Sequence, residues 1–466
     1  MLHSALTFVH FGALLIESAT MTQAPSKRAA VEVEREDIIT ALPRNVVDRI
    51  LELLPVHDAA RTCVLSKKWR DIWVSLPHLV LDNLFCKKLI AKCQFFYSQT
   101  NSESVLRETV DEILLQHIGD IVKFVLDISA VHLSSYDVIN RWMRYVTRNG
   151  VKELTLKMSD NTTYLITYKL PFFVFDCPTL THLELSNCDF KPPNPFLGFQ
   201  NVRTLNLEEI TFVPTTKFCV INAPLLVGLT LKLCHRTQCL KIVSPQLESL
   251  VVRGCHYLVL NCFMNCKKLG VLGIELEKVV DIPKHDEIST LEKLLFNVPL
   301  LEQLYLGPYV LELLSANIIP DGLPSKLNCL WHLDLGVDFG KVDHTSYALQ
   351  LIKSSPNLSK LQIRVKGSDN NAETVMKYLE TPTCLDQPLN KLEHVTIGSF
   401  ECSKTELLFV KLLCARTPSL VRMCIEQGIA IDPKEERNVT IQLIRFPRAS
   451  TKAELFYFPF EATNAN

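Results

Sequence analysis

A short leucine-rich phrase recurs through most of this chain and constrains its fold more than any other feature. The phrase has the form LxxLxL, with other apolar residues in some copies. Its copies begin at Ile121, Val151, Leu180, Val202, Leu226, Leu247, Leu269, Leu301, Leu330, Leu358 and Leu392, so successive copies start 21 to 34 residues apart. Repeats of this length build solenoids in which each repeat adds one strand, and the longer intervals leave room for a helix or loop.

Proline marks the start of several repeats. It stands two residues before the first leucine of the phrase at Pro178, Pro224, Pro245, Pro299 and Pro356. Because proline lacks a backbone donor, it predicts a turn just before the strand begins. Between the first two repeats, residues 135–149 carry Val138, Trp142, Tyr145 and Val146 at helical spacing, which predicts a helix on the far side of the strands.

Ten or eleven parallel strands spaced about 4.8 Å apart would form a curved sheet about 50 Å long, enough to contact a protein surface. Alternate strand residues line its concave face. Tyr and Arg are favoured interface anchors, so we expect target contacts at Arg253, Tyr305, His332, Asp334 and Arg364. The alternative is that these residues are polar only because that face is exposed to solvent.

Residues 37–82 are predicted to form three short helices. Pro43 suits the first turn of a helix, and Pro55 ends that helix. A second helix is expected over roughly residues 58–65, and Ser66 can cap a third that carries two tryptophans.

The first of these helices is amphipathic, with Val46, Ile50, Leu53 and Leu54 in one apolar stripe. A unit of about 45 residues buries little surface, so it needs a partner surface. The candidate anchors are Pro43, Ile50, Leu54, Val64, Leu65 and Trp69. They could equally pack on the rest of this chain, and spacing alone does not decide between the two.

The same segment resembles an F-box. The resemblance rests on LP at 42–43, ILELLP at 50–55, AARTCVLSKKWRDIW at 59–73 and the SLP that follows, a wording found especially in plant F-box proteins. It implies docking onto a Skp-family adaptor and through it to a cullin ubiquitin ligase. Carried over by position, Leu42, Pro43, Ile50, Leu54, Val64 and Leu65 would face the adaptor, and Trp69 would brace the third helix.

The C-terminal segment is expected to cap the solenoid. Leu407, Val410 and Leu413 predict a helix between two strands, and a β-rich ending is expected at 441–446 and 453–458. The segment resembles the FBD-type tail that follows leucine-rich repeats in many plant F-box proteins, with FPRAS at 446–450 as the closest wording.

The fold class expected is therefore an α/β repeat protein: a three-helix F-box, a leucine-rich-repeat solenoid and a capping αβ segment. The expected boundaries are a disordered tail at 1–36, the F-box at 37–83, the repeats at 105–383 and the FBD-like segment at 384–460. We expect the first twenty residues to be dispensable, with Met21 as an alternative start.

The sixteen cysteines are scattered, which favours buried thiols in a reducing compartment over a disulfide framework. Their densest cluster invites a zinc interpretation, although its CxxxxC and CxxxC spacings match no recognised finger; buried structural cysteine is the favoured alternative. The cluster consists of Cys234, His235, Cys239, Cys255, His256, Cys262 and Cys266.

The net charge of the chain and the motifs that it lacks argue against several classes of function. With 49 Lys+Arg against 50 Asp+Glu, bulk charge indicates neither nucleic acid nor a membrane surface as partner. The apolar run 5–16 is too short to span a bilayer and lacks preceding basic residues. Nucleotide-binding, hydrolase and metalloprotease motifs do not occur, so we expect no catalytic residue, cofactor or metal.

We therefore expect a non-catalytic substrate receptor of a Skp–cullin–F-box ubiquitin ligase, located in the cytoplasm or nucleus, with an unknown target protein. The alternative is a leucine-rich-repeat interaction scaffold without a ubiquitination role. A hydrolase hidden in the repeats is a third, less favoured class.

Overall fold

The computed structural model describes residues 42–96, 102–159, 167–194, 196–214, 217–256, 260–277, 291, 293–295, 297–315, 326–367 and 372–460. Two compact units divide the chain, Met1–Val202 and Arg203–Asn466. The expected tail at 1–36 and the expected start at Met21 lie outside the described residues.

Unit 1 begins with the short helices predicted from sequence. They are α3 (Arg44–Leu53), α4 (Val56–Arg61), the 3-10 helix η1 (Thr62–Val64) and α5 (Lys67–Val74). The Pro43 carbonyl accepts hydrogen bonds from the N–H groups of Val46 and Val47, which closes the first turn of α3. The second helix begins directly after Pro55, slightly earlier than expected, because proline fixes the backbone of a helix start.

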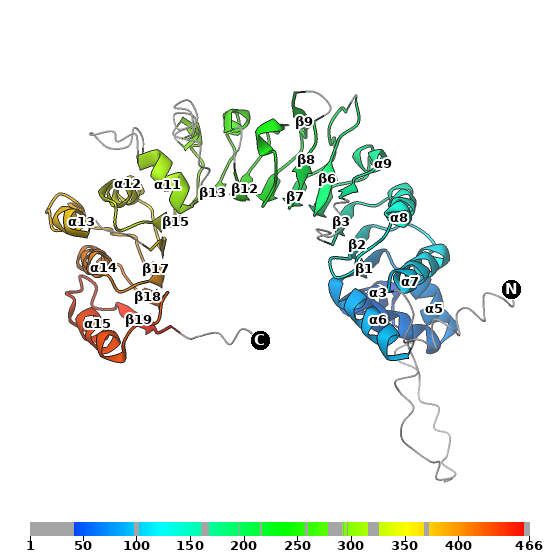
Figure 1. The fold of residues 1–466 in the computed structure, drawn as a ribbon, viewed down its shortest axis with the longest axis horizontal. Helices are drawn as coiled ribbons and strands as arrows, with labels where there is room; N and C mark the ends of the chain where they lie inside the picture. Colours follow the sequence, from blue (N-terminus) through cyan, green and yellow to red (C-terminus); the bar gives the residue numbers. More distant parts are fainter. Residues whose placement is uncertain are drawn as a thin grey trace, which may run out of the picture. The chain divides into compact units, whose positions relative to one another are not determined.

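A parallel sheet follows in unit 1, with helices on one face (Figure 1). Its strands, in spatial order, are β1 (His78–Leu81), β2 (Lys123–Asp127), β3 (Glu153–Lys157) and β5 (His182–Ser186). The helices of this unit are α6 (Asn83–Phe96), α7 (Ser102–Gln116), α8 (Asp137–Arg148) and α9 (Phe172–Phe175). A short strand β4 (Tyr168–Lys169) pairs with β6 (Cys188–Phe190) beside them. Helix α8 confirms the prediction over residues 135–149.

Helix α4 packs against β1, the first strand of this sheet. Val56 and Ala59 of the helix are buried, and they line the same pocket as Leu76 and Val80 of the strand region. The apolar side chains of the F-box thus join the core of the first repeat.

Unit 2 holds the longer parallel ladder. Its strands, in spatial order, are β7 (Thr204–Glu208), β10 (Gly228–Lys232), β12 (Ser249–Cys255), β13 (Val271–Leu276), β14 (Gln303–Leu306), β15 (His332–Val337), β16 (Lys360–Val365), β17 (His394–Phe400), β18 (Arg422–Gln427) and β19 (Glu454–Phe458).

The opposite side of this ladder changes along the chain. The earlier repeats place short elements there, namely β8 (Thr211–Phe212), β9 (Cys219–Asn222), η2 (Thr237–Cys239), β11 (Leu240–Val243) and η3 (Leu260–Phe263). The later, longer repeats place helices there, namely α11 (Pro308–Ser315), α12 (Val342–Lys353), α13 (Ala372–Leu379), α14 (Lys404–Arg416) and α15 (Pro433–Arg445). We use the term open face for the face of the sheet in each unit that these helices and short elements do not cover.

The leucines of the repeated phrase stack in register. Leu229, for example, lies between Leu205 and Leu250 on the neighbouring strands, and all three are at most 1% exposed. Burying each such side chain stabilises the fold by about 1.5–3 kcal/mol. The predicted solenoid is confirmed, and this in-register stack is its core.

The prolines take the predicted place in the turns. The N–H of Leu226 donates to the carbonyl of Ala223 at 3.1 Å, and that of Leu358 to Ser355 at 3.1 Å, so proline occupies the second position of each turn. The N–H of Leu420 donates to the carbonyl of Thr417 at 3.3 Å in the same way and opens a further repeat, which the leucine phrase does not predict.

The C-terminal segment corrects one expectation. Residues 441–445 belong to helix α15, so the strand predicted at 441–446 is wrong. The helix has its own start signals: the Asp432 carboxylate accepts from the N–H of Lys434 at 2.7 Å, and acidic residues fill the first turn. Val439 and Leu443, one turn apart, are its buried residues. Helix α14 and strand β19 are confirmed, and β17, β18 and β19 continue the ladder in parallel.

Candidate functional site

Helix α3 turns one apolar stripe inward and another outward. Val47 and Leu51 are each 1% exposed and join the core, whereas Ile50 and Leu54 are each 38% exposed and Leu53 is 73% exposed. The stripe predicted from spacing is therefore the outward one. Large apolar side chains grouped in this way indicate an interaction surface.

The bend between η1 and α5 extends this apolar surface. Val64 and Leu65 are 64% and 63% exposed. Trp69, only 4% exposed, is held behind them, and its backbone N–H donates to the Ser66 hydroxyl at 3.3 Å as the predicted cap. Burial of the indole fixes α5 against the other helices.

The structure therefore divides the predicted adaptor-facing residues into two groups. Trp69 is a core residue. The exposed or half-buried members, which we call the apolar F-box surface, are Leu42, Pro43, Ile50, Leu54, Val64 and Leu65. Within the described part of the chain, no other element buries this surface.

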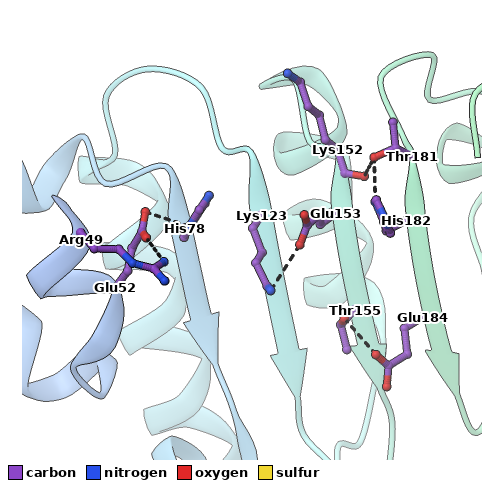
Figure 2. A network of polar contacts seen from close by, with 10 residues as sticks. All are labelled: Arg49, Glu52, His78, Lys123, Lys152, Glu153, Thr155, Thr181, His182 and Glu184. Carbon is purple, nitrogen blue, oxygen red and sulfur yellow. Dashed lines mark hydrogen bonds and ion pairs between the residues drawn. The ribbon is translucent and has the colours of Figure 1, made fainter. Parts of the chain in front are cut away.

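A pocket of about 160 Å³ lies between the F-box helices and the first two strands. Arg49 and Glu52 line it from α3, Leu54 lines it directly after that helix, and His78 and Lys123 line it from β1 and β2. The Glu52 carboxylate accepts from Arg49 Nη1 at 3.2 Å and contacts His78 Nδ1 at 2.9 Å (Figure 2). These contacts tie α3 to the edge of the sheet and offset part of the positive charge in the pocket.

Cross-strand pairs continue over the open face of unit 1 (Figure 2). Lys123 lies 3.2 Å from Glu153, Lys157 lies 2.7 Å from Glu184, and the Thr155 hydroxyl donates to Glu184 at 3.5 Å. Because these groups are partly exposed, each ion pair contributes at most about 1 kcal/mol. These polar side chains of unit 1 are thus paired with one another across neighbouring strands.

The residues predicted to contact a target lie on the open face of unit 2, and four of them interact. The Tyr305 hydroxyl lies 3.2 Å from His332 Nδ1 and donates to Gln303 at 2.7 Å. Arg364 Nε donates to Asp334 Oδ1 at 3.0 Å. His332 and Asp334 are each only 7% exposed, so they support their neighbours more than they present themselves to a partner.

Burial sets the electrostatics of this group. Desolvation, with a smaller contribution from Lys360, lowers the pKa of His332, so the imidazole is neutral near pH 7. Desolvation and the nearby Asp334 carboxylate raise the pKa of Tyr305, which stays protonated. Arg253, the fifth predicted residue, is exposed on β12.

Sequence reasoning missed several exposed aromatic residues in the described part of unit 2. Phe456, Phe458 and Phe460 are 38%, 48% and 44% exposed, and Trp331 is 38% exposed. The Arg422 guanidinium lies 5.3 Å from the centre of the Phe456 ring. Alternation along the ELFYF run could have identified the two phenylalanines of β19.

The cysteine cluster contains buried thiols. Cys234 Sγ contacts the carbonyl of Leu207 at 3.3 Å, and Cys266 Sγ contacts that of Ser244 at 3.3 Å. Burial raises the pKa of Cys266, which favours its neutral thiol. Among the residues that the structure describes, no group of three or more metal-ligating side chains is arranged to hold an ion.

Comparison with known proteins agrees with this architecture. Residues 39–81 match the F-box domain, and residues 113–440 match the family described as "At1g61320/AtMIF1, LRR domain". The F-box/FBD/LRR-repeat protein At1g13570 of Arabidopsis thaliana is 31% identical, over 91% of this chain and 99% of its own length. The chain belongs to the F-box/FBD/LRR-repeat proteins.

Other members of this F-box/FBD/LRR-repeat family are more distant but match over similar lengths. The F-box/FBD/LRR-repeat protein At3g14710 is 23% identical over 95% of this chain and 99% of its own length. The FBD-associated F-box protein At1g66310 is 24% identical over 92% and 97%; both are from Arabidopsis thaliana. F-box/LRR proteins are typically non-catalytic adaptors. No described helix of this chain has the length and apolar character needed to cross a bilayer.

Proposed function

We propose that this chain is the substrate-recognition subunit of a Skp–cullin–F-box ubiquitin ligase. F-box domains in general bind Skp-family adaptors, and the adaptor would join this chain to a cullin. The open face of the repeats would hold the target protein. The chain itself contributes proximity, which raises the effective concentration of the target at the transfer centre.

The observation that supports this proposal most is the apolar F-box surface. Ile50, Leu54, Val64 and Leu65 remain 38–64% exposed although the core residues beside them are almost fully buried. Water contact with so much apolar surface is unfavourable, and a partner that covers it gains a fraction of the roughly 1.5–3 kcal/mol that full burial of a large apolar side chain supplies. An amphipathic helix surface of this kind suits a helical partner protein.

The direct test is a pull-down of the full chain with a purified Skp-family adaptor. We expect binding by the wild-type chain and a loss of about tenfold or more in affinity for Leu65→Lys, because a charge would replace an apolar contact. The double variant Pro43→Ala, Leu54→Ala should weaken binding too, with an unchanged far-UV circular dichroism spectrum.

Leu115→Lys is the matched control. Leu115 is 84% exposed at the end of α7 in the same unit, outside the F-box helices. Its replacement should leave adaptor binding unchanged. A folded wild-type chain that does not bind the adaptor would remove the ligase proposal and leave the alternative of an interaction scaffold.

The target protein has to be found experimentally. Immunoprecipitation with mass spectrometry, with and without proteasome inhibition, should enrich proteins whose abundance rises when degradation is blocked. Recovery of interactors whose abundance is indifferent to inhibition would favour the scaffold. A cytoplasmic or nuclear location remains part of this proposal.

A further inference from the structure

Strand β19 ends the ladder of unit 2, and its outer edge has no partner strand among the described residues. The N–H of Glu454 donates to Val421 on the side of β18. Because backbone groups alternate along a strand in a parallel ladder, the N–H and C=O groups of Leu455 and Tyr457 point to the outer edge. Water can satisfy these groups in the free chain, and another extended backbone can replace that water and continue the ladder.

The edge lacks two of the features that usually prevent strand addition. Within Glu454–Phe458 there is no lysine and no proline, and Pro459 follows only after the strand ends. On the open face the rings of Phe456 and Phe458 are 38% and 48% exposed and stack 6.4 Å apart. Exposed aromatic side chains along an open edge favour association over solvation.

The strand is also fixed in place before any partner arrives. The carboxamide oxygen of Gln427, a residue only 9% exposed, accepts from the Tyr457 hydroxyl at 2.8 Å and from the N–H of Phe460 at 3.2 Å. The amide of Gln427 donates to the carbonyl of Ile429 at 2.6 Å. These bonds turn the backbone after Phe458 toward the end of β18, and a strand held in this way loses little conformational entropy when it pairs.

We infer that β19 is a self-association site at which a second copy of this chain adds its own β19 in antiparallel orientation. The register that overlaps Glu454–Phe458 fully places Phe456 opposite Phe456 of the second copy. Leu455 and Tyr457 then face each other across the two-fold axis in hydrogen-bonded pairs, which supplies about four backbone hydrogen bonds. Phe456 occupies the non-hydrogen-bonded position, where opposing side chains lie closest.

A second copy fits this edge better than an extended peptide. Each copy brings a strand that is already ordered, and one pairing satisfies both free edges at once, whereas a flexible peptide must first be ordered. The edge is short, so the contact is small compared with a permanent dimer interface. Self-association should therefore depend on concentration. It does not depend on adaptor binding or on the proposed function.

The test is analytical ultracentrifugation of the purified full chain over a wide range of concentration. We expect a monomer–dimer equilibrium for the wild type and a shift of about tenfold or more toward monomer for Phe456→Lys, which opposes two charges at the axis. An equimolar mixture of Phe456→Lys and Phe456→Glu chains should dimerise more strongly than either variant alone.

Phe172→Lys is the control, because Phe172 is 60% exposed in unit 1 and should leave the equilibrium unchanged. Far-UV circular dichroism of each variant identifies any loss of fold. A wild-type chain that stays monomeric at the highest concentration, as it would if its own residues or a target covered the edge, overturns the inference. A dimer that Phe456→Lys does not weaken overturns it too.

Discussion

Arg364 donates a hydrogen bond from Nε to Oδ1 of Asp334 at 3.0 Å, across neighbouring strands of the unit 2 ladder. The Asp334 side chain is 9% exposed, whereas that of Arg364 is 34% exposed. A second carboxylate, Glu275, lies 3.7 Å from Arg364 Nη1. The guanidinium therefore covers and neutralises a nearly buried carboxylate.

Arg364→Ala should lower the free energy of unfolding by about 1–3 kcal/mol, because it leaves the Asp334 carboxylate buried without its donor. Denaturant titration measures the change. Adding Asp334→Asn to this variant should recover part of the loss, since no buried charge then remains. Arg253→Ala, on the exposed part of the same face, is the control. Equal effects of Arg253→Ala and Arg364→Ala would contradict this role of Arg364.

Substitution of Trp69 should mainly reduce stability, whereas substitution of Leu65 should mainly reduce adaptor binding. Trp69→Ala removes a side chain that is 4% exposed and should cost about 3–5 kcal/mol of stability. Leu65→Ala changes a residue that is 63% exposed and should cost less than about 0.5 kcal/mol while weakening adaptor binding. Thermal unfolding and adaptor titration on the same preparations separate the two effects. A large loss of stability for Leu65→Ala would place it in the core instead.

Two glycines on the open face provide a steric comparison. A Cβ at Gly336 would lie 2.5 Å from Pro308 Cδ and 2.7 Å from its backbone nitrogen, whereas a Cβ at Gly273 would approach no closer than 3.5 Å, to Val251. Gly336→Ala should therefore destabilise the chain by about 1–3 kcal/mol, and Gly273→Ala should be close to neutral. Thermal unfolding of both variants checks the difference. Equal melting temperatures of the two variants would contradict this expectation, because the backbone at Pro308 would then move to accommodate the added methyl group.

His344 predicts a pH dependence of stability. It is 2% exposed on α12, and neither ring nitrogen has a hydrogen-bond partner among the described residues. Burial and the Lys341 and Lys366 charges lower its pKa below 6.5, although Asp338 and Glu312 oppose the shift. The unfolded chain therefore binds a proton more readily, and stability falls as the pH drops through about 6.5 and below.

Replacing this imidazole should remove part of that dependence. His344→Leu should reduce the loss of unfolding free energy between about pH 7.5 and about pH 5.5. His132→Leu, which replaces an exposed histidine, is the control variant. Denaturant titrations at both pH values give the comparison. Identical slopes for His344→Leu and wild type would assign the dependence to other groups, such as the buried His332 and His117, whose pKa values are also lowered.

The period of the leucine phrase was enough to predict the ladder, because apolar stacking fixes its register. The first strand did not follow from that period, for a local reason. Leu76, Leu79 and Leu81 carry the phrase, but they follow the helix of Trp69 and Trp73 directly, so the sequence indicates a continuation of the F-box there. The run 441–446 is rich in β-branched and large apolar residues, yet the helix signals at Asp432 and Pro433 decided its structure.

The candidate sites show a different limit. Alternation predicted the open face for Tyr305, His332 and Asp334, and the strand pairing agrees. It could not reveal that Arg364 covers Asp334, because side-chain contacts between strands distant in sequence decide exposure. For the same reason, spacing alone could not tell which stripe of α3 faces outward.

The match to the F-box domain ends at residue 81, the last residue of β1, and α4 packs against that strand. The F-box and the first repeat therefore share one strand. Replacing the F-box of this chain with a foreign one up to residue 81 would remove β1, the strand with which β2 pairs. A chimaera would therefore have to retain Leu76–Leu81 and place the junction before Leu76.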